Sequence, residues 1–507
     1  MPIFESAATS HPGASRFEGK IIRLVERARA EQRTTGLLAL LLAGFGMCWL
    51  AFDVGSLASL DPHLDISEMS VWAQHFAFGY KHPPLSAWIF SLWFSVFPRA
   101  AWAAHLLAAT TVTLTLAITW RLLRDHLDFN RALVGIASLV LVPLYTFQAI
   151  KFNANLVMMP FWAAALLYYL RARSGFRVSD AALAGACAGF AFLGKYWAIY
   201  LIAGMAIAAI IGPTARRFWR SPAPYAMAIS AFVVVAPHLH WFLTERGSDT
   251  DNFLLGLASK GSFGTEFAQS LSYLLGTIAY IGAPLLFFAT LRPGRAGVAD
   301  TLVPREESRR LALILLLVPL LLPALLNLVL PHRLTPLWTF PNWAILPVVL
   351  FGSPLLDVPA LAAVRGVLVA ALVSIAAAIA SPVLAYSHLY GGSEPHRPHW
   401  RKIAETIDNV SGGKVRFLSG DDKITEGLPF YLTKARLLQG SDLSTVRPVG
   451  IGEAELAIVC RRDDAACQSR GDALRSGMWT DFASTRHFLG VSGPSANYRI
   501  KIASMKP

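Results

Sequence analysis

Charged residues are scarce in this chain: Asp, Glu, Lys and Arg make up 15% of its 507 residues, whereas 54% are hydrophobic. A soluble globular domain carries about 25% charged residues. The shortage excludes an ordinary soluble protein and indicates a chain that lies mostly in a lipid bilayer. Acidic residues are the scarcer kind, with 32 Asp and Glu against 45 Lys and Arg.

This excess of positive charge has two explanations. In a membrane protein, cytoplasmic loops are rich in Lys and Arg, and basic residues are attracted to anionic lipid head groups. Alternatively, some of these cations hold a phosphate group in a site, although the loop explanation is the commoner one for any single residue. No basic run is interleaved with aromatic residues, so we predict no nucleic-acid partner.

Cysteine is also rare, with four residues in the whole chain. Cys48 and Cys187 lie within apolar spans, where cysteine usually serves as an inert packing residue. Cys460 and Cys467 lie close together in a polar region and could form a disulfide if that region faces an oxidising compartment. No second Cys or His pair accompanies them, so a zinc site is not predicted. The pairing itself stays open.

Long hydrophobic runs, by contrast, are abundant. We predict about eleven transmembrane helices, because alternate loops carry the arginines that mark the cytoplasmic side. The basic residues 1–36 form too long a polar segment for a signal peptide and no cleavage site follows, so we expect them to remain in the cytoplasm. The predicted spans cover residues 36–52, 101–120, 133–150, 156–170, 181–193, 198–212, 223–243, 271–291, 311–330, 343–356 and 366–386.

The predicted organisation is a cytoplasmic segment at 1–36, a transmembrane domain at 37–390 and an extracytoplasmic domain at 391–507. The first outer loop covers 53–99, and its apolar part at 88–97 is too short to cross a bilayer, so we predict an interfacial helix there.

The final part, 391–507, changes character. Short apolar runs at 415–420, 428–433 and 455–460 are separated by polar turns and predict strands, and the preceding segment 399–410 has helical spacing. We predict a small α/β domain.

The stretch at 61–88, DPHLDISEMSVWAQHFAFGYKHPPLSAW, concentrates ionisable residues directly after the first span. Such residues are costly near a bilayer, so a cluster of them at its face points to function. A carboxylate can take a proton from an attacking hydroxyl while cations stabilise a phosphate leaving group. The stretch contains Asp61, His63, Asp65, Glu68, His75, Lys81 and His82.

Other predicted outer loops also carry polar residues. We expect them to surround an aqueous cavity that opens to the outer leaflet. These polar residues are Lys151, Asn153, Asn155, Lys195 and Arg333. The two lysines, Lys151 and Lys195, have a commoner alternative role, which is to extend to the membrane interface without contacting a substrate.

Structural roles compete with the chemical ones in the first loop. Glu68 could be a solvated residue on an interfacial helix, or it could be catalytic or bind a metal. Asp61 stands before Pro62 and is better explained as a cap or turn residue, whereas Asp65 is the better site candidate. His82 could be a hydrogen-bonded structural residue or could contact substrate or metal.

The segment GYKHPPLSAW at 79–88, with acidic residues shortly before it, resembles a signature of bacterial polytopic glycosyltransferases. These are the C-type relatives of the protein O-mannosyltransferases and of the lipid A aminoarabinose transferase. The resemblance implies a C-type glycosyltransferase fold, a sugar donor carried on a polyprenyl phosphate, and inverting transfer. It also implies that the acids of the first loop act as base or metal ligand and that a cation beside the Pro-Pro pair contacts the phosphate.

On this basis we predict Glu68 and Asp65 as catalytic residues. A divalent metal ion held by Glu68 and His82 is left open, and no nucleotide cofactor is expected. The residues predicted to bind substrate or phosphate are Tyr80, Lys81, His82, Lys151, Asn153, Asn155, Lys195 and Arg333.

Three positions depart from the family pattern. The adjacent Asp-Glu pair of the family stands here as Ser67-Glu68, and a second acid that usually precedes a tryptophan is Asn155, before Trp162. The lysine before the Pro-Pro pair of the aminoarabinose enzymes is His82 here. These departures suggest a subfamily with another sugar or acceptor.

The resulting hypothesis is a hexosyl- or pentosyltransferase of the bacterial inner membrane. It would move a sugar from a polyprenyl-phosphate carrier to a periplasmic acceptor, with lipid A or another envelope glycolipid favoured. A protein O-glycosyltransferase of the same fold is the first alternative. A transporter or flippase for a polyprenyl-linked lipid is less favoured, because it would place ionisable residues on broken helices at the bilayer midplane. A scaffold that has lost catalysis is a further possibility.

Overall fold

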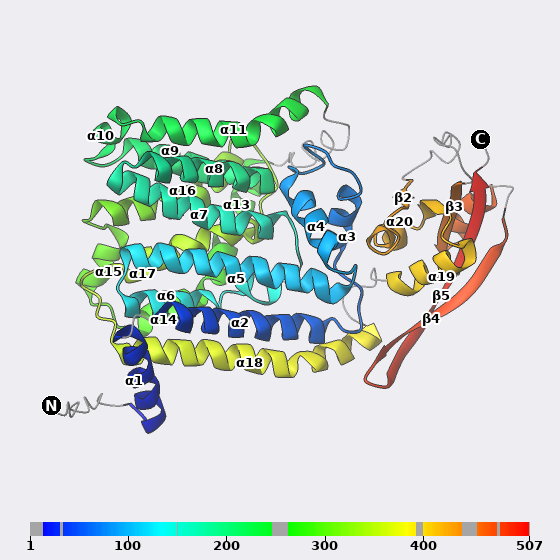
Figure 1. Cartoon of the computed structure of the whole chain (residues 1–507), viewed down its shortest axis with the longest axis horizontal. Coiled ribbons are helices and arrows are strands. Elements are labelled where there is room, and N and C mark those ends of the chain that lie inside the picture. Colours follow the sequence, from blue (N-terminus) through cyan, green and yellow to red (C-terminus); the bar gives the residue numbers. More distant parts are fainter. Residues whose placement is uncertain are drawn as a thin grey trace.

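The computed structural model describes residues 14–30, 34–149, 151–245, 262–391, 399–438, 454–473 and 477–505. Most of its long helices run side by side and form a bundle, and a small domain built on a β-sheet lies at one end of that bundle (Figure 1). The predicted fold class is confirmed, since the chain is mostly helical, has several apolar helices and ends in a small sheet domain.

The apolar helices indicate a multi-pass membrane protein. Among the described residues, five helices are long and apolar enough to cross a membrane. A sixth span results if α13 (Phe263–Tyr280) and α14 (Gly282–Thr290), which are bent by 53° at their junction, count as one. The five are α2 (Thr34–Ser56), α5 (Ala101–His126), α11 (Ala223–Thr244), α16 (Glu307–Asn327) and α18 (Ala360–Gly391).

The predicted total of about eleven spans stays a prediction. The remaining predicted spans coincide with helices that are shorter or, for one of them, less apolar than those five. These helices are α6 (Phe129–Leu139), α7 (Ala154–Gly175), α8 (Val178–Gly194), α9 (Ile199–Ile210) and α17 (Leu346–Phe351).

Glycine allows α8 and α11 to pack closely. A Cβ atom at Gly185 would lie 2.0 Å from the carbonyl oxygen of Met227, and one at Gly189 would lie 3.0 Å from Val234. Small residues allow the backbones of apolar helices to approach in this way, and dispersion contacts then hold the helices together.

The two ends of the bundle differ in the residues they carry. The arginine-bearing helices α1 (Arg16–Ala30), α10 (Ala215–Arg220) and α15 (Arg295–Leu302) lie at the end away from the sheet domain (Figure 1). The first outer loop, with α3 (Leu64–Trp72) and α4 (Leu85–Val96), lies at the opposite end. This separation agrees with the predicted alternation of loops. Which end faces the cytoplasm stays a prediction.

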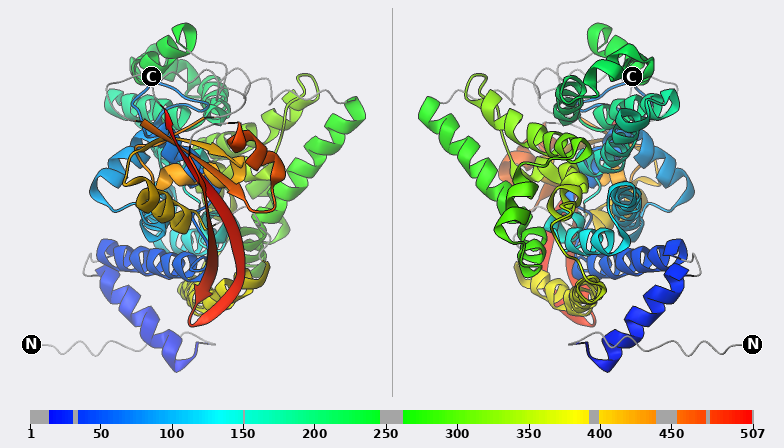
Figure 2. Two further views of the ribbon diagram at one scale, coloured as in Figure 1. Left: turned by 90° about the vertical axis from the view of Figure 1, so that its right-hand side faces the viewer. Right: turned by 90° about the vertical axis from the view of Figure 1, so that its left-hand side faces the viewer.

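The sheet domain has five strands in the order β2-β1-β3-β5-β4. The strands β1, β2 and β3 are parallel, whereas β5 pairs antiparallel with β3 and β4. The long hairpin of β4 and β5 crosses the end of the bundle (Figure 2), where Arg486 donates to the carbonyl of His388 on α18 over 3.4 Å. The strands are β1 (Val415–Gly420), β2 (Arg436–Leu437), β3 (Ala454–Arg461), β4 (Trp479–Phe488) and β5 (Val491–Met505).

The strands predicted at 415–420 and 455–460 are confirmed, but the one predicted at 428–433 is wrong. This run forms the 3-10 helix η5 (Leu428–Phe430) followed by a turn. Its apolar residues are buried as a strand's would be, but Pro429 has no N–H to donate to a sheet. Cys460 and Cys467, whose pairing the sequence left open, form a disulfide between β3 and α21 (Ala465–Asp472).

Asp61 joins the sheet domain to the first outer loop. Its carboxylate accepts hydrogen bonds from the backbone N–H groups of Trp400 (2.6 Å) and Arg401 (3.3 Å), and from the hydroxyl of Tyr431 (3.0 Å). Asp61 therefore caps α19 (Trp400–Ser411), where the helix dipole favours a negative charge. The capping role favoured for Asp61 is confirmed, but the helix that it caps begins 339 residues later.

Two further hydrogen bonds reinforce this contact. Ser70 donates to the carbonyl of Pro429 over 3.1 Å, and Gln74 donates to that of Ala435 over 2.7 Å. The first loop and the sheet domain therefore hold each other in place.

Replacement of Asp61 by Ala should loosen this contact. Loss of a helix cap typically costs about 1–2 kcal/mol. We expect a lower melting temperature of the purified protein and faster amide hydrogen exchange at the start of α19. Asp463→Ala provides the control, because Asp463 makes an exposed ion pair with Arg461 and should contribute little. Unchanged exchange at α19 in the Asp61 variant would contradict the capping role.

Candidate active site

Helix α3 presents the two acidic side chains predicted to be catalytic. Asp65 and Glu68 are three residues apart, so they lie on the same side of the helix. His63 begins the helix as its cap, and its Nδ1 atom accepts the backbone N–H of Asp65 over 3.1 Å. The helix thus holds both carboxylates at the end of the apolar bundle.

Asp65 is bound to the start of α7. Its carboxylate accepts a hydrogen bond of 2.7 Å from the Asn153 side chain, which also caps α7. Burial alone would raise the pKa of Asp65, but the neighbouring His63 side chain, the hydrogen bond from Asn153 and the charge of Lys151 outweigh it and hold the pKa at about 2. Asp65 is therefore a stable anion and a poor proton acceptor, which favours an anchoring role over that of a base.

Lys195 lies on the other side of this cluster, directly after α8. Its Nζ donates to the Asn155 side chain over 2.7 Å and lies 4.4 Å from the ring centre of Trp338. Burial lowers the pKa of Lys195 to about 7, although the charge of Asp65 opposes that shift. A nearby phosphate group would favour the ammonium form.

Glu68 and Lys81 form an ion pair of 2.6 Å. The two side chains are 34% and 40% exposed, so a substrate can reach both without unfolding the loop. The sheet domain borders this pair through Glu426. The pKa of Glu426 is raised by burial and then by the charges of Asp422 and Glu68, so Glu426 lies close to Glu68.

The loop at 77–82 owes its shape to aromatic contacts. A Cβ atom at Gly79 would lie 2.0 Å from the ring of Trp241, so only glycine fits there. The Tyr80 ring stacks on Trp72 with centroids 5.9 Å apart, and its hydroxyl donates to the carbonyl of His75 over 2.5 Å. These contacts give Tyr80 a structural role. A substrate contact for it stays a prediction.

His82 is half-buried beside Trp72, with ring centroids 5.5 Å apart. Burial, followed by the charges of Lys195 and Lys81, holds the pKa of His82 well below its usual value. A neutral imidazole cannot act as a phosphate-binding cation, so the cluster favours Lys81 and Lys195 for that role.

The structure thus brings together most of the predicted site residues. The exception is Arg333, which is exposed and makes no contact with the cluster among the interactions of the described residues. The grouped residues are Asp65, Glu68, Tyr80, Lys81, His82, Lys151, Asn153, Asn155 and Lys195.

Sequence reasoning missed partners that only the fold reveals. His63 supports Asp65, and Trp338 lies under Lys195. His238 binds the carbonyl oxygen of Phe78 over 2.6 Å and so attaches the loop to α11. All three residues belong to polar or aromatic clusters visible in the sequence, but the sequence does not show which residues they contact in the fold.

The described residues do not fit a protein-only metal site. Within the described ranges, no group of three or more His, Cys, Asp or Glu side chains is placed to hold a metal ion. A metal held by Glu68 and His82 would need further ligands from substrate or water.

Comparisons with known proteins support the resemblance inferred from the sequence. Residues 81–241 match the family described as dolichyl-phosphate-mannose-protein mannosyltransferase. The lipid A galacturonosyltransferase RgtD of Rhizobium johnstonii is 26% identical over 303 residues. That match covers 56% of this chain and 58% of the relative, so it spans less than two thirds of the relative's length.

Solved structures show the same fold. ArnT from Cupriavidus metallidurans, bound to undecaprenyl phosphate, superposes with a TM-score of 0.62 at 15% identity, over 92% of this chain and 98% of ArnT. Its apo structure gives the same TM-score and coverage at 14% identity. The fold implied by the resemblance is therefore confirmed, and it is shared over nearly the whole chain.

The low pKa of Lys195 predicts a pH-dependent contribution to stability. Between pH 7 and its ordinary pKa of 10.5, the unfolded chain holds a proton at Lys195 that the folded protein lacks. Raising the pH within this window therefore favours the folded state. We expect the melting temperature of the purified protein to rise relative to that of Lys195→Met between pH 7 and pH 9. Lys434→Met, at an exposed position, is the control and should show a constant difference. A Lys195→Met difference that does not change with pH would contradict the burial of this charge.

Proposed function

We propose that this chain is a membrane glycosyltransferase that transfers a sugar from a polyprenyl-phosphate carrier to a glycolipid, with lipid A as the favoured acceptor. The observation that carries the proposal is that Lys81, paired with Glu68, and Lys195 are both close enough to His82 to lower its pKa, on a fold shared with an ArnT structure that contains undecaprenyl phosphate. The similarity to a lipid A galacturonosyltransferase supports the choice of acceptor.

In this proposal, the cations bind the donor. Lys81 and Lys195 contact the phosphate of the carrier and stabilise the negative charge that develops as the sugar leaves. Phosphate binding returns Lys195 to its ammonium form, because an adjacent anion raises the pKa of a lysine. Asp65 and Asn153 hold the cluster in position.

Glu68 acts on the acceptor. Its carboxylate takes the proton of the acceptor hydroxyl while that oxygen attacks the anomeric carbon of the sugar. The bond between this carbon and the phosphate oxygen breaks, the configuration at the carbon inverts, and polyprenyl phosphate leaves with the bonding electrons. If the acceptor is itself a phosphate, no base is needed and Glu68 only positions the acceptor.

A protein hydroxyl is the second candidate acceptor. It is favoured by the description of the family that residues 81–241 match, which contains protein mannosyltransferases. The sugar, hexose or pentose, stays open in both cases.

The acceptor can be identified by mass spectrometry of lipid A from cells with and without the gene. We expect the deletion strain to lose one sugar-sized mass from lipid A and a plasmid copy to restore it. Unchanged lipid A would remove this acceptor and direct the search to glycoproteins and other glycolipids.

The role of Glu68 can be tested in the same complementation. Glu68→Gln keeps the shape of the side chain but removes the base, and we expect a rate of transfer about 100- to 10,000-fold lower with unchanged protein level. Glu306→Gln is the matched control, because Glu306 is exposed at the far end of the bundle, at the start of α16. Full transfer by a folded Glu68→Gln protein would exclude Glu68 from the chemistry.

A further inference from the structure

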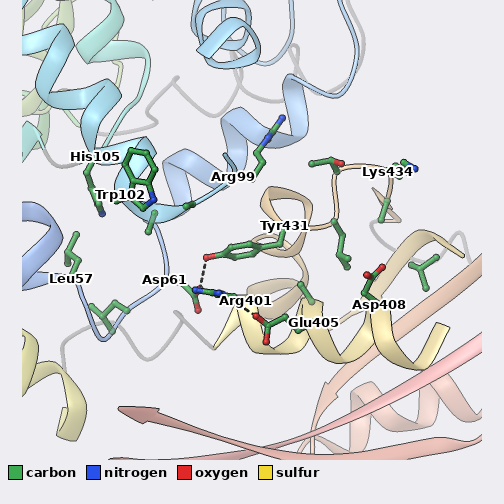
Figure 3. A pocket seen from close by; sticks show the side chains of 18 of the residues that line it. Leu57, Asp61, Arg99, Trp102, His105, Arg401, Glu405, Asp408, Tyr431 and Lys434 are labelled. Atoms are coloured by element: carbon green, nitrogen blue, oxygen red, sulfur yellow. Dashed lines mark hydrogen bonds and ion pairs between the residues drawn. The ribbon is translucent and has the colours of Figure 1, made fainter. Parts of the chain in front are cut away.

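A cavity of about 840 Å³ lies where the helix bundle meets the sheet domain. Its lining comes from the ends of α2 and α5 on one side and from α19 on the other, as Figure 3 shows for Leu57, Trp102 and Arg401. The volume is within the range of about 300–1,000 Å³ that is typical of small-molecule sites. None of the ten predicted site residues lines it.

The two walls of this cavity differ in polarity. Val54, Leu57 and Trp102 form an apolar wall that continues the surface of the bundle. The sheet domain contributes a polar wall, which includes Glu405 and Lys434 (Figure 3). An amphipathic molecule, with chains along the bundle and a polar head in the cavity, matches both walls.

The acidic residues of the lining are largely engaged within the protein. Asp61 caps α19, and Glu405 pairs with Arg401 over 3.1 Å. Asp408 is the remaining acid of the lining. A bound molecule would therefore meet few free negative charges here.

Three cations of the lining, Arg99, Arg416 and Lys434, make no ion pair with a carboxylate among the described residues, and Arg416 instead donates to the carbonyls of Gly413 and Val415. Arg99 donates to the Ser70 hydroxyl over 3.1 Å and lies 5.0 Å from the ring centre of Phe94, and these contacts fix its guanidinium. Lys434 is exposed and makes no hydrogen bond or ion pair within the described part of the chain. A preorganised guanidinium and an exposed ammonium in the lining of one cavity are suited to a phosphate group.

Helix α3 separates this cavity from the candidate active site. Ser70, which holds Arg99, lies about 140° around the helix axis from Asp65, since each residue turns an α-helix by about 100°. A helix with its side chains is about 10–12 Å across. A head group longer than about 10–12 Å can span the helix. Its charged end would then occupy the cavity while its opposite end reaches Glu68.

We propose that this cavity binds the phosphate-bearing end of the acceptor glycolipid, on the side of α3 remote from the reacting sugar. The proposal rests on the proposed function and names a second subsite for its acceptor. Arg99 and Lys434 bind the phosphate, and the apolar wall at Trp102 accommodates the adjoining chains.

The test measures binding without turnover, so it is independent of whether transfer is detected. The full chain in lipid nanodiscs is titrated with bisphosphorylated lipid A, with dephosphorylated lipid A and with undecaprenyl phosphate. We expect the phosphorylated acceptor to bind the wild type at least tenfold more tightly than the dephosphorylated one. Arg99→Gln combined with Lys434→Gln should abolish that preference and leave the affinity for undecaprenyl phosphate unchanged.

Controls separate the alternatives. Lys434→Gln alone alters an exposed side chain, should fold normally and should lose part of the preference. Arg462→Gln removes an exposed cation elsewhere on the sheet domain and should keep it. Equal loss of undecaprenyl phosphate binding would overturn the proposal by making the cavity a donor site. Displacement of lipid A by millimolar inorganic phosphate would overturn it in favour of a free-phosphate site, and so would an unchanged preference in the double variant.

Discussion

Charged side chains at the end of an apolar bundle are stable only when each one has a partner, and this constraint organises the structure. Asp65 is bound by Asn153 and Lys195 by Asn155, which ties α3 and the loop after α8 to the start of α7. These partly buried bonds hold the cluster in position. The Glu68–Lys81 pair, with side chains 34% and 40% exposed, remains available to a substrate.

The sheet domain is part of this arrangement. Its helix α19 begins at the Asp61 carboxylate, and Glu426 lies close enough to respond to the charge of Glu68. Docking of the domain on α3 therefore shapes one border of the candidate site and, on the opposite side of the helix, the cavity near Arg99. A short helix with a different ligand on each side would allow a donor and an acceptor to approach each other from separate directions.

The departures from the family pattern have a physical consequence in this fold. An acid at position 155 would form an ion pair with Lys195 and raise the pKa of that lysine, whereas beside the neutral Asn155 burial lowers this pKa and the charge of Asp65 only partly opposes the shift. Ser67 is buried at 1% exposure, so the family's second acid in α3 is replaced by a residue that packs. Asp65 and Glu68 are therefore the two acidic side chains that α3 contributes to the candidate site.

The sequence by itself determined the membrane class, the position of the polar loop and the two strands at 415–420 and 455–460, because hydropathy and alternation are local properties. It also identified Glu68, Lys81, Asn153 and Lys195 as site candidates. Only the tertiary structure decided that Asp61 caps a helix 339 residues away, that the run around Pro429 is not a strand, and that Asp65 and His82 are held as anion and neutral imidazole. These properties depend on burial and on partners distant in the chain, which no local pattern specifies.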